Sequence, residues 1–331
     1  MQQIVPIQIL RGLAALAIVV LHAFHDAGFL AAARGWSFIA PDWPLGAGVD
    51  LFFVISGFVM VVASQNLFAQ PSAPYQFLGR RLARIVPIYW AATTLFLVIL
   101  LARPDMLNSP LPEMGEIIRS YLFIPYLKGS DGLIQPVYKL GWTLNYEMMF
   151  YVVFALAIVL PAPLALAAVT AFFAGLVALG LVLTPSPGVL SFWTSPMILE
   201  FVAGMWLGLA RLSGFHLPRL AGPALVLLGL LLIAAGGSIV TDLERLMNWG
   251  LPSALIVAGA SLGPGNERPE GHSLPVRALA SLGDASYALY LCHPFAIRLF
   301  RMVWEKSGIA ALFGAGTAGA WVYILVATLA A

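Results

Sequence analysis

The chain has 331 residues, of which 61% are hydrophobic and only 10% are charged, and its formal net charge at pH 7 is +2. Its mean hydropathy of +0.92 lies far above the balance that is usual for a water-soluble domain. This composition excludes a soluble globular protein, and no run of like charge indicates a nucleic-acid partner or an appended domain. We therefore expect a polytopic protein surrounded by membrane lipid.

Apolar stretches of membrane-spanning length recur along the whole chain. A spanning helix needs about 20 predominantly apolar residues. The predicted spans are 5–26, 48–66, 82–101, 142–160, 162–183, 193–210, 220–240, 247–262, 284–304 and 313–331. They predict an all-α fold, a polytopic bundle of about ten transmembrane helices that forms one membrane-embedded domain over residues 1–331. We expect the first span to stay uncleaved, because it lacks the basic flank of a signal peptide.

The distribution of basic residues gives an orientation. With a cytoplasmic N-terminus, the inner loops hold Arg80, Arg81, Arg84, Arg211, Arg219, Arg268 and Arg277, whereas the long outer loop 102–141 holds Arg103, Arg119, Lys128 and Lys139. Cytoplasmic loops carry an excess of Lys and Arg. The count favours cytoplasmic termini.

The first predicted span, "RGLAALAIVVLH", carries Arg11 and His22. Eleven positions make about three turns of helix, so both side chains share a face and lie roughly 16 Å apart along the axis. An intramembrane arginine costs about 2.5–3.5 kcal/mol on insertion scales, so such residues usually face a cavity or a partner. The alternative is that Arg11 snorkels to the headgroups and His22 forms a helix–helix hydrogen bond.

The second and third predicted spans start with further polar residues. Asp50 opens the second span, where Ser56-Gly57 provides small residues that let another helix come close. Arg80, Arg81 and Arg84 start the third span, with Arg84 four residues after Arg80 and three after Arg81, so their guanidiniums can converge, and the N-terminus of the helix adds positive potential. This outlines a phosphate site. Ordinary anchoring of the helix at the membrane surface remains the alternative.

The fourth predicted span contains "WTLNYEMMFY", with Glu147 about a turn and a half from its start. Thr143 and Tyr151 lie one turn away on the same side. Glu147 and His22 both fall in the outer halves of their helices, so a direct hydrogen bond between them is sterically reasonable. A carboxylate on one imidazole nitrogen makes the other more basic, as a general base requires. A purely structural buried ion pair is the alternative.

The ninth predicted span contains "SYALYLCHPF", where Ser286, Tyr290 and His293 make a polar line on one face. Both a functional role and helix packing explain this line. Pro294 lacks a backbone N–H, so it leaves a backbone carbonyl of the preceding turn open to another hydrogen bond. The outer loop 102–141 is long enough to be a lid or an element that contacts a substrate.

In this order, these stretches resemble acyltransferase family 3, a family of integral membrane acyltransferases, and especially its stand-alone members that modify exopolysaccharide. The resemblance runs from Arg-x10-His through "FFVISGF", "RRLARIVPIYW" and "WTLNYEMMFY" to "SYALYLCHP". It implies an essential His22, a supporting Glu147, and a set of arginines that handle acyl-CoA: Arg11, Arg80, Arg81 and Arg84. Supporting or acceptor-binding roles are expected for Asp50, Trp142, Tyr151, Ser286, Tyr290 and His293.

The resemblance also implies the reaction. An acyl group, expected to be acetyl, would pass from cytoplasmic acetyl-CoA to a hydroxyl of an extracytoplasmic polysaccharide or a lipid-linked glycan, across a bacterial inner membrane. Acetyl-CoA is then a substrate, with no permanently bound cofactor and no metal, and a homo-oligomer stays open. The sequence departs from the family at Cys292, where tryptophan is frequent, and at Asn145-Tyr146, where Ser-Val is frequent. These departures bear on the choice of acceptor.

A transporter or flippase for a lipid-linked sugar is the main alternative function, since it also uses intramembrane charges such as His22 and Glu147. It does not explain a cytoplasmic cluster of arginines aligned with a buried histidine. A membrane sensor or export scaffold needs no buried base at all.

Overall fold

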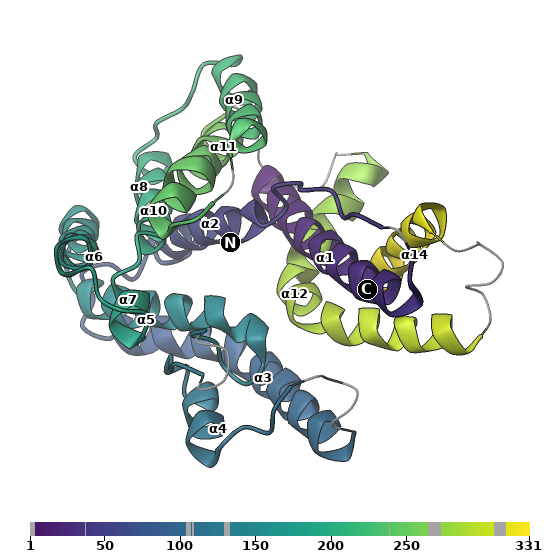
Figure 1. Ribbon diagram of the computed structural model, residues 1–331. Coiled ribbons are helices and arrows are strands. Elements are labelled where there is room, and N and C mark those ends of the chain that lie inside the picture. Colours follow the sequence, from purple (N-terminus) through teal and green to yellow (C-terminus); the bar gives the residue numbers. More distant parts are fainter. Residues whose placement is uncertain are drawn as a thin grey trace. The chain divides into compact units, whose positions relative to one another are not determined.

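The structure is a computed structural model that describes residues 4–36, 38–103, 107, 109–128, 133–237, 239–263, 273–307 and 316–331. Over these residues it is helical apart from turns, loops and one isolated bridge between Leu127 and Ile134 (Figure 1). Every predicted span contains a helix: α1 (Val5–Arg34), α2 (Ala47–Ala63), α3 (Ala73–Ala102), α5 (Trp142–Ala157), α6 (Ala162–Leu183), α8 (Ile198–Leu212), α9 (Ala221–Ala235), α11 (Leu251–Ser261), α12 (Leu274–Lys306) and α14 (Thr317–Ala330). The prediction of an all-α fold is confirmed.

Short helical segments lie in the connections: α4 (Met114–Tyr121), η2 (Lys139–Gly141), α7 (Val189–Trp193), α10 (Asp242–Arg245) and η3 (Leu246–Gly250). Three sequence predictions reach beyond the described residues. These are Arg268 of the predicted inner loops, parts of the outer loop 102–141, and the beginning of the predicted span 313–331.

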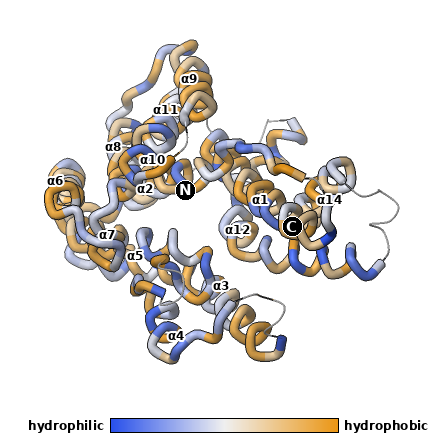
Figure 2. The backbone as a smooth tube through the Cα atoms, in the orientation of Figure 1, coloured by the Kyte–Doolittle hydropathy of each residue, from blue (hydrophilic) through white to orange (hydrophobic). Residues whose placement is uncertain are grey.

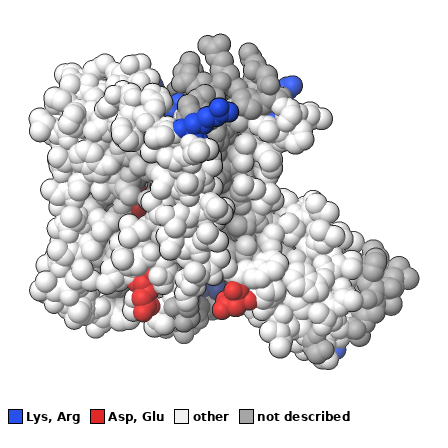
Figure 3. All heavy atoms as spheres, turned by 90° about the horizontal axis from the view of Figure 1, so that it is seen from above, with Lys and Arg blue, Asp and Glu red and all other residues white. Residues whose placement is uncertain are grey.

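Hydrophobic residues dominate the helices, as the hydropathy colours of Figure 2 show, and charged side chains are sparse on the face drawn in Figure 3. Four segments are long and apolar enough to cross a membrane: Val5–Arg34, Ala73–Ala102, Ala162–Leu183 and Val189–Leu212. The apolar helices α2, α9 and α14 are shorter. The structure thus supports a helical membrane protein, whereas the predicted number of ten spans is not established.

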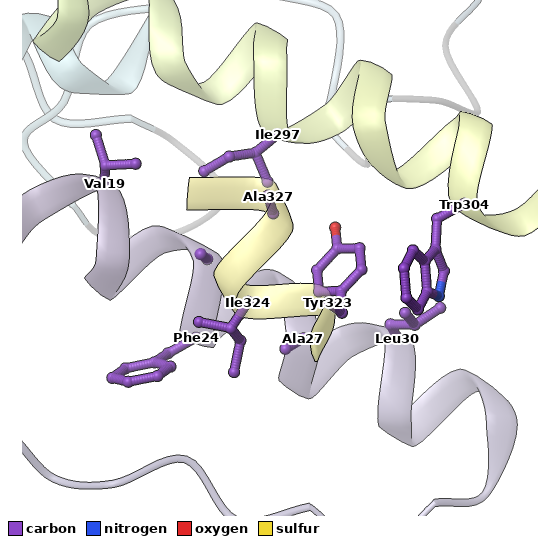
Figure 4. Packing of buried hydrophobic residues seen from close by; sticks show 10 residues of the cluster. Val19, Phe24, Ala27, Leu30, Ile297, Trp304, Tyr323, Ile324 and Ala327 are labelled. Carbon is purple, nitrogen blue, oxygen red and sulfur yellow. The ribbon is translucent and has the colours of Figure 1, made fainter. Parts of the chain in front are cut away.

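The helices form two compact units, one of which comprises residues 2–52, 233–235 and 265–331. In this unit α1 packs along α12 and against α14. Its core gathers side chains from all three helices (Figure 4): Val19, Ala23, Phe24, Ala27, Leu30, Ile297, Trp304, Tyr323, Ile324 and Ala327. We call it the histidine unit, because it contains His22. Glycine allows the close packing of α1 on α12, since a Cβ at Gly283 would lie 1.9 Å from the carbonyl oxygen of Gln8.

The second unit comprises residues 53–232 and 236–264, and we call it the arginine unit. In it α5 packs against α3, α6 and α8, and α8 packs against α6 and α11. Helices α2 and α8 cross closely: a Cβ at Gly57 would lie 2.0 Å from the carbonyl oxygen of Phe201, and one at Gly204 would lie 1.9 Å from that of Val54. The prediction that Ser56-Gly57 lets another helix approach is confirmed.

Replacing Gly57 with alanine should therefore destabilise the arginine unit. The atom in the way belongs to the backbone of α8, so the two helices must move apart, and overpacking of this kind costs about 1–3 kcal/mol. Gly175 of α6 is the matched control, because a Cβ there meets nothing within 4 Å. The melting temperature of Gly57→Ala should fall, while Gly175→Ala melts at or slightly above the wild-type temperature. Equal melting of both variants would contradict the close crossing.

The outer loop 102–141 is held against α3 where it is described. The side chain of Ser120, in α4, accepts from the backbone N–H of Val137 (2.9 Å), and its carbonyl accepts from the Tyr89 hydroxyl (3.1 Å). The indole of Trp90 donates to the carbonyl of Tyr121 (2.9 Å). These bonds fix the end of the loop that leads into α5.

Candidate active site

Helix α1 carries Arg11 and His22 on one continuous helix, as the sequence predicts. The Arg11 side chain is buried, with 8% of the residue exposed, and its guanidinium donates to the side-chain oxygen of Gln8 (2.9 Å). An arginine buried by protein does not snorkel to the headgroups. It is held in place by its neighbours, with its charge inside the histidine unit.

The partner that the structure gives His22 is a second histidine. His293, from α12, has its Nε2 atom 2.9 Å from Nδ1 of His22, and the two ring centroids are 5.0 Å apart. His293 is fully buried and His22 is partly exposed. Spacing along the ninth predicted span had singled out His293, but only the packing of α1 on α12 joins it to His22.

Backbone carbonyls fix the tautomers of this pair in its neutral state. Nδ1 of His22 lies 3.0 Å from the carbonyl oxygen of Ile18, and Nδ1 of His293 lies 3.0 Å from that of Leu289. A carbonyl only accepts, so each Nδ1 carries the hydrogen, and the single Nδ1–H of His22 is shared between the carbonyl of Ile18 and Nε2 of His293, which accepts. Nε2 of His22 then bears a lone pair. That is the protonation state of a general base.

A charged cluster lies one turn further along α1. The Arg301 guanidinium of α12 donates to Oδ1 of Asp26 (2.9 Å), and the Tyr323 hydroxyl of α14 donates to the other carboxylate oxygen. The side chains of the ion pair are only 17% and 15% exposed. The cluster joins the three helices that carry or support the histidine pair. The sequence analysis missed it, although Asp26 follows His22 by four residues, on the same helix face.

In the arginine unit, Glu147 lies where the sequence predicts it, in the second turn of α5. Its Oε1 atom accepts from the hydroxyl of Tyr151 (2.5 Å) and from the hydroxyl of Ser56 on α2 (3.3 Å). The hydroxyl of Thr143 bonds instead to the carbonyl of Leu140 (3.2 Å). Of the two neighbours expected on the same side, Tyr151 makes the contact.

The expected pair of Glu147 with His22 joins residues of the two units, and each unit is described by itself. The hydrogen bonds described for Glu147 go to Tyr151 and Ser56, and those of His22 go to His293 and Ile18. The direct pair stays a prediction.

The three arginines of the third predicted span lie together on α3, but not at its start. The helix begins at Ala73, seven residues before Arg80. The effect of a helix dipole falls off within the first turn, so the expected help from the helix N-terminus is wrong. The side chains of Arg80 and Arg84 are exposed and that of Arg81 is partly exposed.

The Arg81 guanidinium lies 5.6 Å from the ring centre of Phe77, and the Phe77 ring lies 5.8 Å from that of Tyr151. Phe77 thus lies between Arg81 and the tyrosine that bonds to Glu147. Arg80 and Arg84 can reach a ligand.

Of the remaining predicted residues, Trp142 is partly exposed and the others are buried. Asp50 is fully buried in the first turn of α2, and Trp142 starts α5. Ser286 donates to the carbonyl of Gly283 (2.7 Å), a local bond that favours packing for this residue. The Tyr290 ring lies 6.3 Å from that of His293. The polar line on α12 therefore leads to the histidine pair.

Comparison with known proteins identifies the family. The sequence pattern of the family described as "Acyltransferase domain", acyltransferase family 3, matches residues 5–331. The chain is also similar to "Exopolysaccharide production protein ExoZ" of Rhizobium meliloti (strain 1021), with 38% identity over 269 residues, 81% of this chain and 80% of the relative. No solved structure matches. The match runs through the histidine pair, the arginine cluster and Glu147, and this helical membrane protein belongs to acyltransferase family 3 and is an acyltransferase.

Proposed function

We propose that the protein transfers an acetyl group from cytoplasmic acetyl-CoA to a hydroxyl of an extracytoplasmic or lipid-linked polysaccharide, in the inner membrane of a bacterium and with its termini in the cytoplasm. The observation that carries the proposal is the His22–His293 pair, which leaves one imidazole nitrogen of an acyltransferase ready to accept a proton. The name of the Rhizobium relative adds exopolysaccharide production as the context.

The chemistry follows from the tautomers of the pair. Nε2 of His22 accepts the proton of the acceptor hydroxyl while the oxygen attacks the thioester carbonyl. The tetrahedral intermediate collapses, the C–S bond breaks, and the imidazolium returns its proton to the leaving thiolate. The products are an O-acetyl ester and free CoA. The Nδ1–H bond to His293 spreads the positive charge that His22 carries in between.

In an alternative route, Nε2 of His22 attacks the thioester carbonyl, the C–S bond breaks and the thiolate leaves. The acceptor hydroxyl then attacks the acetyl-imidazolium, its proton passes to the thiolate, and the imidazole is released. Both routes need an unprotonated Nε2 on His22, so both depend on the carbonyls that hold hydrogen on Nδ1.

The arginine unit supplies the groups for the donor. CoA carries several phosphates, and arginine offers planar pairs of donors that match phosphate oxygens. Arg80 and Arg84, four residues apart on α3 and both exposed, are the residues that we assign to these phosphates. Arg81 lies over the ring of Phe77 and adds positive potential beside them.

The donor assignment predicts that Arg84→Ala weakens binding of acetyl-CoA by about 10- to 100-fold, since a hydrogen bond to a charged group contributes about 1.5–3 kcal/mol. Arg84→Lys should restore binding only in part, because lysine lacks the bidentate fork. Arg219→Ala is the matched control: Arg219 is also exposed and is predicted to lie on the same side of the membrane. Calorimetry of CoA binding measures all three variants. Unchanged affinity in Arg84→Ala would remove Arg84 from the donor site.

The proposed reaction is tested with detergent-purified protein, acetyl-CoA labelled in the acetyl group, and a glycan fraction that has been de-O-acetylated with mild alkali. Label that enters the glycan and is released again by alkali shows O-acetyl transfer. Labelled butyryl-CoA in a parallel reaction tests the length of the acyl group. Transport of a lipid-linked sugar without transfer of label to any glycan would support the transporter alternative and overturn the proposal.

A further inference from the structure

A cavity of about 320 Å³ lies in the arginine unit, at the end of α5 where Trp142 starts the helix. Its walls come from residues 133–135 of the outer loop, from the first turns of α5, from the α7–α8 segment and from α10. Its volume lies at the lower end of the range of about 300–1,000 Å³ that is typical of small-molecule sites. It has room for a single ring-sized unit of a larger ligand.

Aromatic rings form one side of this cavity. The rings of Tyr146 and Phe192 stack, with centroids 3.9 Å apart and planes at 18°, and Trp142 stands at right angles to Tyr146 at 6.1 Å. Tyr146 and Phe192 are buried, whereas Trp142 is partly exposed. An indole in this position offers a flat apolar face together with a polar N–H.

Polar groups form the other side. The Asp242 carboxylate accepts from the hydroxyl of Ser195 (2.6 Å), and the Arg245 guanidinium lies 5.8 Å from the ring centre of Trp142. Gln135 and Ser191 add an amide and a hydroxyl to the lining. The cavity thus combines one negative charge, one positive charge and neutral hydrogen-bonding groups beside an aromatic wall.

A capping box holds the segment with these two charges. The carboxylate of Glu244 accepts from the backbone N–H groups of Val240 (2.8 Å) and Thr241 (2.9 Å), while the hydroxyl of Thr241 accepts from the N–H of Glu244 (3.2 Å). The bonds from Val240 and Thr241 lower the pKa of the Glu244 carboxyl, which therefore stays ionised in neutral and mildly acidic solution. The start of α10 is fixed before a ligand arrives.

The charge balance selects the class of ligand. Asp242 and Arg245 give the lining one charge of each sign, so an anion or a cation gains from one of them and loses to the other, whereas a neutral polar ligand can bond to both. A sugar ring fits both sides: it has apolar C–H faces for an indole and hydroxyl groups that donate to a carboxylate and accept from a guanidinium.

The predicted topology places the cavity on the side of the acceptor. With a cytoplasmic N-terminus, the loops before the fourth span, after the fifth and after the seventh all lie outside the membrane. Residues 133–135, the α7 segment and α10 belong to these three loops, and in the structure they meet in one cavity. Three loops with the same predicted side thus come together within a single unit.

From these observations we infer that this cavity binds an uncharged sugar unit of the acceptor polysaccharide, with the ring against Trp142 and its hydroxyls on Asp242 and Arg245. The inference rests on the proposed function and names the acceptor subsite. Helix α5 links it to the reaction machinery, because Glu147 follows Trp142 by about 8 Å along the same helix axis.

The test uses the full-length protein, acetyl-CoA and oligosaccharides cut from de-O-acetylated exopolysaccharide of the bacterium that encodes the protein. Trp142→Leu and Asp242→Asn should each raise the KM for the oligosaccharide about tenfold or more, while calorimetry finds unchanged affinity for acetyl-CoA. Asp242 is exposed and asparagine has its shape, so this variant tests the site even if Trp142→Leu folds poorly. Trp206→Leu is the control, since Trp206 is an exposed tryptophan of α8 outside the cavity.

Two results would overturn the subsite while the enzyme works: an unchanged oligosaccharide KM in both variants, or a loss of acetyl-CoA affinity with an unchanged KM for the acceptor. Failure of the proposed function looks different, because the wild-type protein then binds acetyl-CoA but labels no oligosaccharide. Calorimetric titration of the oligosaccharides into the wild-type protein and Asp242→Asn decides about the cavity in that case. Equal binding, or none, by both proteins rejects the sugar subsite.

Discussion

Replacing His22 with alanine is expected to abolish acetyl transfer while the protein stays folded and inserted in the membrane. A general base contributes about 10²- to 10⁴-fold to a rate. In the histidine pair Nε2 of His22 stays unprotonated, so its lone pair can accept a proton. The measurement is the rate of transfer of labelled acetyl at saturating acetyl-CoA, together with the melting temperature of the same sample.

Two further variants make this test specific. His22→Gln keeps the size of the side chain and a donor for Ile18 and His293, but has no basic nitrogen, so it should be as inactive as His22→Ala. His293→Ala should lose less rate than either, because it removes the support and leaves the base. His216→Ala is the control, since His216 is an exposed histidine that bonds only locally, to the carbonyl of Gly214 (2.7 Å). Turnover of His22→Gln near the wild-type rate would exclude general-base catalysis by His22.

Hydropathy predicted the helices well, because each span is an apolar run and most charged residues lie in the segments between the runs. It predicted the helix ends less well. Helix α3 begins at Ala73 and not at 82, and α12 begins at Leu274 and not at 284. In both cases the first turns are too polar to register as membrane-spanning, although they continue the same helix. The helix N-terminus was therefore placed too close to Arg80.

Residues of the candidate site could be predicted one at a time, but their contacts could not. Spacing on one helix placed Tyr151 and Thr143 beside Glu147, since residues four apart are neighbours on a helix surface, and Tyr151 is the one that bonds to it. The contact of His22 with His293 spans 271 positions of sequence and depends on how α1 and α12 are rotated about their axes. The sequence did offer one signal for this contact, a histidine in each of two apolar spans. A hydrogen bond between the two imidazoles is the simplest way to give both side chains a polar partner.

The cavity in the arginine unit could not be predicted from the sequence. Its lining comes from connections, where no periodicity marks which side chains point inward. Of its lining residues the sequence analysis named Trp142, through the resemblance to the family, and Tyr146, as a departure from the family pattern that bears on the choice of acceptor. It also named the outer loop as an element that contacts the substrate. The segment of Asp242 and Arg245 carried a recognisable capping box, which predicts a short helix and not a binding site.

Glu147→Gln is the second variant with a large expected effect, because it separates a catalytic carboxylate from a structural one. Glutamine keeps the shape and an oxygen that accepts from Tyr151 and Ser56, but loses the negative charge. If that charge stabilises the imidazolium of His22 or the position of Arg81 during transfer, turnover should fall steeply. The melting temperature and the affinity for acetyl-CoA should then change little.

A structural role gives the opposite pattern. If Glu147 instead forms the structural ion pair that the sequence analysis left open, its replacement leaves the charge of the partner uncompensated, at a cost of about 3–5 kcal/mol for a buried pair, so the variant should melt early whatever its activity. Tyr151→Phe is the matched control, since it removes the 2.5 Å hydrogen bond and keeps the charge of Glu147. Turnover that survives in Tyr151→Phe and is lost in Glu147→Gln assigns the effect to the charge. An active Glu147→Gln protein with a sharply lowered melting temperature would remove Glu147 from the catalytic machinery and leave it a structural role.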